Sequence, residues 1–142
     1  MNKKWVGTLV ATLFWTVSVG AQWTARGDVA AGFGETLIVA VGCSGTNPVA
    51  SIRFVDDGNF ASGVVIAAFD NRDPLDLEFV NRGQQLNAVL ANGPGREFVQ
   101  LLIRSGQLTV GVGRRGRSAP VVETISLRGS GAAIHSLACI RR

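Results

Sequence analysis

Three residues in this sequence could serve in catalysis, metal binding or a disulfide: the single histidine, His135, and two cysteines, Cys43 and Cys139. A serine hydrolase would need a nucleophile, this imidazole and an orienting acid brought together. No Gly-x-Ser-x-Gly elbow is present, and we expect His135 to be a solvated or capping side chain on the outer flank of a C-terminal helix. The sequence therefore indicates no catalytic residue and predicts a protein that is not an enzyme.

Acidic residues cluster twice without forming a recognisable site. The segment 70–76 holds three aspartates that could offer oxygen ligands to calcium, but their spacing departs from an EF-hand loop and Pro74 and Leu75 interrupt them. We expect turn-capping aspartates and no bound metal. Asp56 and Asp57 are adjacent and should point apart, which does not suit a glycosidase pair.

A basic cluster is the remaining candidate for binding chemistry. Arg114, Arg115 and Arg117 lie within four positions, and guanidinium groups bind phosphate and carboxylate bidentately. We predict an anion-binding or partner-binding site here, with a solvated turn as the alternative. The overlapping run from Gly111 to Gly116 spells Gly-x-Gly-x-x-Gly, but nothing around it suggests a βαβ unit. We expect a strand that ends in a hairpin tip, and no cofactor.

The first 21 residues have the pattern of a secretory leader. Met1–Lys4 carries two lysines, Trp5–Val19 is uncharged, and small residues precede a cleavage point after Ala21. An uncleaved membrane anchor is the alternative, although the uncharged run to Ala25 is barely long enough to span a bilayer and contains polar residues. We predict a single exported β-rich domain, 22–142, in the periplasm or outside the cell, without stable membrane insertion after cleavage.

The predicted mature chain has the size of one domain with one core. It keeps 12 basic residues, all arginine, against 10 acidic residues, so its net charge is about +2. This excess is small, and no aromatic residues alternate with the arginines. A nucleic-acid partner is therefore not expected.

An exported chain with two cysteines predicts a disulfide between Cys43 and Cys139. The alternatives are free thiols or metal ligands, but two distant cysteines and one histidine make a poor zinc site. In a continuous C-terminal helix Cys139 would point away from the apolar face, and the helix could fray before it.

Short apolar segments separated by turn signals indicate a β-rich fold. Asp56–Asn59 predicts a hairpin turn, Gly45–Pro48 another turn, and 23–34 an extended segment that places Trp23 over the core. The alternation in 75–80 leaves one face wet, which favours an antiparallel sheet. We predict a small antiparallel β-sandwich or barrel, with strands at 35–43, 51–55, 63–69, 75–80, 85–90, 107–112 and 121–127.

Two helices are expected around this sheet structure. Helical spacing predicts a short helix over 97–105, before the penultimate strand, with a strand as the rival. Ser130 is placed to cap a second helix after the turn at Gly129. The apolar face of that helix would contain Ala133, Ile134, Leu137, Ala138 and Ile140.

The C-terminal half also resembles a known family. The motifs are Leu101-Leu102, Gly106–Val110 and Ile125–Gly129, followed by Ala133-Ile134 and Leu137. Over about forty residues they resemble the closing pattern of the invasion-associated locus B family, which are exported proteins of Gram-negative bacteria. Similar endings occur in other small periplasmic proteins, including accessory proteins of type VI secretion. The resemblance implies an exported β-sandwich with a docked C-terminal helix and no catalytic residues.

These observations predict an exported, non-enzymatic binding or accessory protein that contacts an envelope component or a protein partner. Anions in an envelope include lipid head groups, lipopolysaccharide and cell-wall carboxylates. Two alternatives are an inhibitor of a hydrolase such as lysozyme or a protease, and a type VI secretion accessory protein. A basic inhibitor of a basic lysozyme would face charge repulsion.

Overall fold

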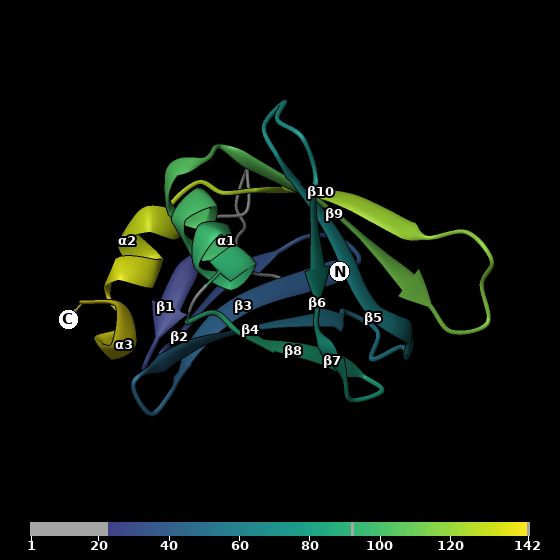
Figure 1. Ribbon diagram of the computed structural model, residues 1–142, viewed down its shortest axis with the longest axis horizontal. Coiled ribbons are helices and arrows are strands. Elements are labelled where there is room, and N and C mark those ends of the chain that lie inside the picture. The colour runs from purple at the N-terminus through teal and green to yellow at the C-terminus, as the bar shows by residue number, and fades with distance from the viewer. Residues whose placement is uncertain (1–22, 92, 142) are drawn as a thin grey trace, which may run out of the picture.

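The computed structural model describes residues 23–91 and 93–141, which form two antiparallel sheets and three helices around one core (Figure 1). The predicted antiparallel sandwich is confirmed, and the two sheets do not close into a barrel. The larger sheet has the order β1 (Thr24–Arg26), β2 (Val29–Phe33), β3 (Leu37–Ser44), β4 (Asn47–Phe54), β8 (Gln85–Val89), β7 (Val80–Asn81). The smaller has the order β10 (Val121–Ser126), β9 (Gln107–Arg114), β5 (Phe60–Phe69), β6 (Leu75–Glu78). The predicted leader, 1–21, and Gln22 lie outside the described residues.

Strand β3 is central, as its two apolar faces predict. Leu37, Val39 and Val41 are fully buried, whereas Ile38 and Ala40 on the other face are half-buried. Burying each large apolar side chain contributes roughly 1.5–3 kcal/mol. β3 pairs with β2 on one side and β4 on the other.

The turn after β3 is tighter than predicted. Gly45 (φ 63°) and Thr46 form it, while Asn47 and Pro48 already pair with β3. Because β3 therefore ends just after Cys43, that cysteine lies at the end of the sheet.

The predicted extended segment 23–34 is a hairpin of β1 and β2, with Gly27 at a positive φ of 63° in its turn. Trp23 is 4% exposed, as its predicted place over the core requires. Its indole N–H donates to the Ser126 carbonyl (3.1 Å). A side chain at Gly32 would collide with this indole, so the close approach of the ring requires glycine there.

The segment 55–59 does not form the predicted hairpin. β4 belongs to the larger sheet and β5 to the smaller one, so this segment carries the chain between layers. Asp57, not Gly58, has the left-handed φ (63°), and its N–H donates to the Phe54 carbonyl (3.1 Å). Hairpins and crossings between layers use the same turn residues, which is why the residue types alone predicted the wrong connection.

The predicted strand 75–80 is divided between the two sheets. β6 pairs with β5, and after Phe79 the chain passes into β7, which pairs with β8. Leu77 and Phe79 are buried, as the alternation predicts. The Phe79 N–H donates to the Gly63 carbonyl (2.8 Å) at the crossing. Both sheets face one core, so the inward alternation continues unchanged when the chain changes sheet.

Helix α1 (Gly93–Arg104) confirms the predicted helix and begins four residues earlier than 97. Its buried side chains are Phe98, Val99, Leu101 and Leu102. The Phe98 ring lies edge-on to Phe69, with 5.7 Å between centroids. Through these contacts α1 completes the core beside β5.

Helix α2 (Ser130–His135) is not capped by Ser130 as predicted. Its N-cap is Gly129, with φ 83°. Ser130 is buried, and its hydroxyl instead donates to the Leu102 carbonyl near the end of α1. This hydrogen bond ties α2 to α1.

The predicted C-terminal helix is present as two short helices, α2 and α3 (Ala138–Arg141), so it is interrupted before Cys139, as the expected fraying allowed (Figure 1). Leu137, between them, is fully buried. Because the helix is interrupted, Leu137 can enter the core while Cys139 reaches Cys43. In a single regular helix the two side chains could not do both, since Cys139 would point away from the apolar face.

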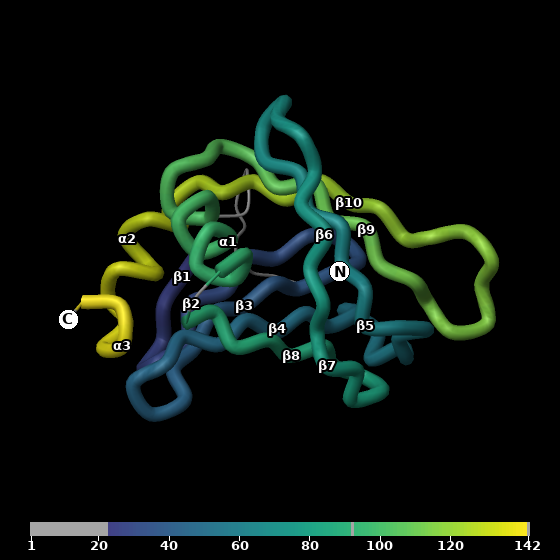
Figure 2. The backbone as a smooth tube through the Cα atoms, viewed as in Figure 1, coloured from purple at the N-terminus to yellow at the C-terminus, as the bar shows by residue number. Residues whose placement is uncertain are grey.

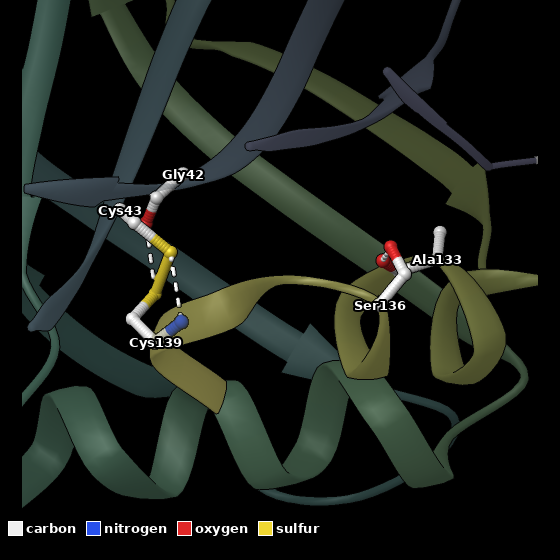
Figure 3. Close-up of a disulfide and its surroundings, with 5 residues drawn as sticks. All are labelled: Gly42, Cys43, Ala133, Ser136 and Cys139. Carbon is white, nitrogen blue, oxygen red and sulfur yellow. Dashed lines mark hydrogen bonds between the residues drawn. A yellow bond between two sulfur atoms is a disulfide. The ribbon is translucent and has the colours of Figure 1, made fainter. Parts of the chain in front are cut away.

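The predicted Cys43–Cys139 disulfide is confirmed, with 5.8 Å between Cα atoms (Figure 3). The Cys139 N–H also donates to the Cys43 sulfur (3.2 Å). Closing a loop of 96 positions stabilises the fold by about 4–5 kcal/mol in the chain-entropy model.

None of the helices within 23–91 and 93–141 has the length and apolar character needed to cross a bilayer.

Candidate binding surface

His135 is exposed at the end of α2, in agreement with its expected outer position. It lines a polar cleft of about 320 Å³ together with Arg96 and Gln100 of α1.

Among the residues the structure describes, no group of three or more His, Cys, Asp or Glu side chains could hold a metal ion. The Asp70 carboxylate instead accepts N–H bonds from Gly106 (3.1 Å) and Gln107 (3.0 Å).

The structure separates Arg114 from the other two arginines of the predicted cluster. Its Nη2 lies 2.8 Å from Asp56 Oδ2, and its Cζ lies 4.5 Å from the centroid of the Phe54 ring. The hydrogen bond from Arg114 holds the pKa of Asp56 below its ordinary value, and the Gly58 N–H adds to this effect. Arg114 therefore packs against the body of the protein beside β4.

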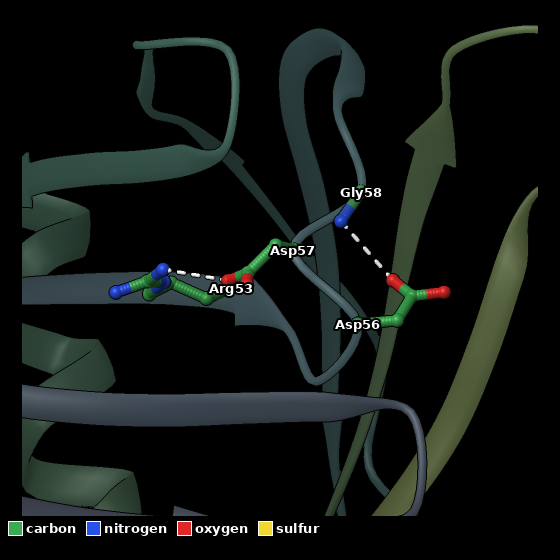
Figure 4. Close-up of polar contacts among 4 residues, drawn as sticks. All are labelled: Arg53, Asp56, Asp57 and Gly58. Carbon is green, nitrogen blue, oxygen red and sulfur yellow. Dashed lines mark hydrogen bonds and ion pairs between the residues drawn. The ribbon is translucent and has the colours of Figure 1, made fainter.

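Asp56 and Asp57 point in different directions, as predicted (Figure 4). Asp57 pairs with Arg53 (2.8 Å), whereas Asp56 accepts from the Gly58 N–H (3.1 Å) and from Arg114. The two carboxylates stabilise the crossing between the sheets and do not converge on a common point.

Arg115 and Arg117 remain together in the turn between β9 and β10, with Gly116 between them at φ 86°. We call residues 115–119 the tip; all of them are exposed. Figure 2 shows this loop projecting beyond the rest of the smaller sheet, at the right of the view. Within the described part of the chain neither arginine forms a salt bridge. Two of the three predicted arginines are therefore presented to solvent.

An apolar groove runs over the outer face of the smaller sheet, next to the tip. Its volume is about 330 Å³, within the usual range for ligand sites. Gly111 of β9 lies between Ile66 of β5 and Val122 of β10 in the sheet register. We call this feature the β9 groove; its lining residues are Ser62, Val64, Ile66, Ala68, Pro74, Thr109, Gly111, Val112, Gly113, Pro120 and Val122.

Sequence reasoning missed the β9 groove. Val64, Ile66 and Val122 lie in the predicted strands 63–69 and 121–127 and are 46%, 47% and 62% exposed. The available signal was the outward pair Gly111 and Gly113, because glycine at alternate positions lowers one face of a strand.

Glu123 holds the edge strand β10 next to the larger sheet. Its carboxylate accepts N–H bonds from Glu35 (2.7 Å), Thr36 (3.1 Å) and Leu37 (2.8 Å). Charge-assisted bonds of this kind are stronger than neutral ones. They hold the strand that carries Val122, and with it one side of the β9 groove.

No protein-family model matches the chain, and comparisons with curated proteins and with solved structures found no significant match. The resemblance to the invasion-associated locus B family therefore remains a prediction from the C-terminal motifs.

Proposed function

We propose that the protein is an exported, non-enzymatic binding or accessory protein that contacts an envelope component or a protein partner through the outer face of its smaller sheet. The observation that carries this proposal is the β9 groove, where Val64, Ile66 and Val122 remain half-exposed beside a basic tip. Exposed apolar patches next to polar residues are typical of interaction sites.

The residues of the β9 groove favour binding over catalysis. Ser62 and Thr109 are its only hydroxyl-bearing residues, and it has no His, Cys, Asp, Glu, Lys or Arg in its lining. The Thr109 hydroxyl already shares a hydrogen bond with Thr124 (2.9 Å). Acid–base catalysis requires a titratable group within reach of the reacting atom, and this groove offers none.

The disulfide supports the proposed export, because such bonds persist in oxidising compartments. It joins β3 to α3 across 96 positions and so depends on oxidation after most of the chain has been made. The leader pattern and this bond favour the same compartment.

Photo-crosslinking in intact cells tests the proposed function. A benzophenone amino acid in place of Val64 should capture a defined envelope component, because this side chain faces solvent in the β9 groove. The matched control is Val89, which is 62% exposed but belongs to the larger sheet. Equal adducts from both positions, or none from Val64, would contradict the proposal.

Inhibition of a hydrolase is a second candidate, favoured by the projecting tip. Residues 115–119 are all exposed and include two arginines, a form suited to insertion into an acidic active site. Assays with a trypsin-like protease and with lysozyme check this candidate, and unchanged turnover at excess protein would exclude both targets.

A further inference from the structure

We propose that the β9 groove binds the acyl chain of an anionic lipid and that Arg115 and Arg117 hold its head group. This inference rests on the proposed function, since it assigns a ligand class to the same surface.

The shape of the groove suits a linear chain. Its course along Thr109–Gly113 is about 13 Å long at the usual rise per strand residue. Gly111 and Gly113 have no side chain to interrupt it. A Cβ added to Gly111 would lie 3.7 Å from Cγ2 of Val122, so this valine borders the floor directly.

The hydrogen bonding of the sheet favours an acyl chain over a peptide. β9 is paired with β5 on one side and β10 on the other, so its backbone has no bond to offer an occupant lying on the face. A peptide there would lose water from its own N–H and C=O groups without replacement. An acyl chain has no such groups and gains from burying each methylene.

The charges around the groove favour one orientation of the ligand, with its anionic head group at the tip. Gly113 and Pro120, which line the groove, flank the basic tip. The register places Asp76 opposite Ile66 and Glu78 opposite Val64, so the β6 side is acidic. An anionic head group is repelled from that side and attracted to the arginines at the tip.

Calorimetric titration of the purified full-length protein with dodecanoate, below its micelle concentration, tests this assignment. Dodecanoate should bind, and dodecanol should bind about tenfold more weakly because it lacks the charge. Gly111→Leu should reduce the affinity at least about a hundredfold by filling the groove. Ile66→Asp should also weaken binding. The fold should tolerate both variants, because a Cβ at Gly111 would meet its neighbours at ordinary contact distances and Ile66 is 47% exposed.

Arg115→Ala/Arg117→Ala should reduce the affinity about tenfold and weaken its dependence on salt. The matched control Arg82→Ala/Arg104→Ala removes the same charge at exposed positions outside the tip and should bind like the wild type. Unchanged binding in Gly111→Leu, or equal affinity for dodecanol and dodecanoate, would overturn the proposal.

Failure of the folded wild-type protein to bind dodecanoate would also overturn the lipid assignment. Capture of a protein by the Val64 crosslinker would then leave the proposed function standing with a different ligand. Failure of both experiments would remove the proposed function as well.

Discussion

An oxygen of the Glu123 carboxylate lies 2.8 Å from the backbone nitrogen of Leu37 and joins the edge strand β10 to the first residue of β3. Two preceding amides, of Glu35 and Thr36, bind the same carboxylate. A side chain from one sheet thus satisfies three consecutive donors that precede or begin a strand of the other. It links the two layers at one end of the sandwich.

Replacing Glu123 with Gln should therefore lower the free energy of unfolding by about 1–3 kcal/mol, because a neutral amide accepts these bonds less well. Urea unfolding measures the difference. Glu35→Gln is the matched control, since it makes the same change on an exposed neighbouring residue and should have little effect. Equal losses in both variants would show that net charge, and not the three hydrogen bonds, is responsible.

Arg114→Gln should raise the pKa of Asp56 towards its ordinary value, because the Arg114 hydrogen bond is the main cause of its lowering. NMR titration of the side-chain carboxyl group measures this shift. Arg53→Gln removes the ion pair to Asp57 and should leave the pKa of Asp56 low. An unchanged Asp56 titration in Arg114→Gln would contradict the assigned cause.

The same pair predicts a dependence of stability on pH. The pKa of Asp56 is lower in the folded protein, so its contribution is fully present above the unfolded value of about 4. That contribution is lost as the pH falls through the lower folded pKa. Asp56→Asn should remove this part of the acid dependence, which urea midpoints measured across the acidic range would detect.

Loss of the disulfide should lower the free energy of unfolding by up to about 4–5 kcal/mol, because the unfolded chain regains the entropy of a long loop. The variant Cys43→Ser/Cys139→Ser, compared with the oxidised protein in urea unfolding, measures this effect. Reducing agent should lower the midpoint of the wild type and leave that of the double variant unchanged. Equal stability of the oxidised wild type and the double variant would show that the bond contributes no stability.

Ser130→Ala should lower the free energy of unfolding by about 1–3 kcal/mol, because it leaves the buried Leu102 carbonyl without its hydroxyl donor. Thermal or urea unfolding measures the loss. Ser136→Ala is a suitable comparison, since its hydroxyl binds the Ala133 carbonyl (2.7 Å) at an exposed position (Figure 3). A smaller effect at Ser130 than at Ser136 would contradict the link between α1 and α2.

Local periodicity in the sequence was sufficient to predict several elements. Apolar residues on both faces of the segment 35–43 predicted a central strand. The spacing of Phe98, Leu101 and Leu102 predicted α1. These patterns are local, because one face of a strand or helix must meet the core wherever the element is placed. Two cysteines also left one intramolecular disulfide pairing, which the structure confirms.

Tertiary structure decided which elements meet and which side chains remain available. Inward alternation is the same in either layer of a sandwich, so Asp57 and Phe79 gave no local sign that the chain changes sheet there. Arg114 and Arg115 are adjacent arginines that the sequence does not distinguish, but it is Arg114 that lies beside Phe54 and Asp56. The β9 groove exists because Gly111 is aligned with Ile66 and Val122 across three strands. Such alignment depends on register between distant segments, which the order of residues along one strand does not contain.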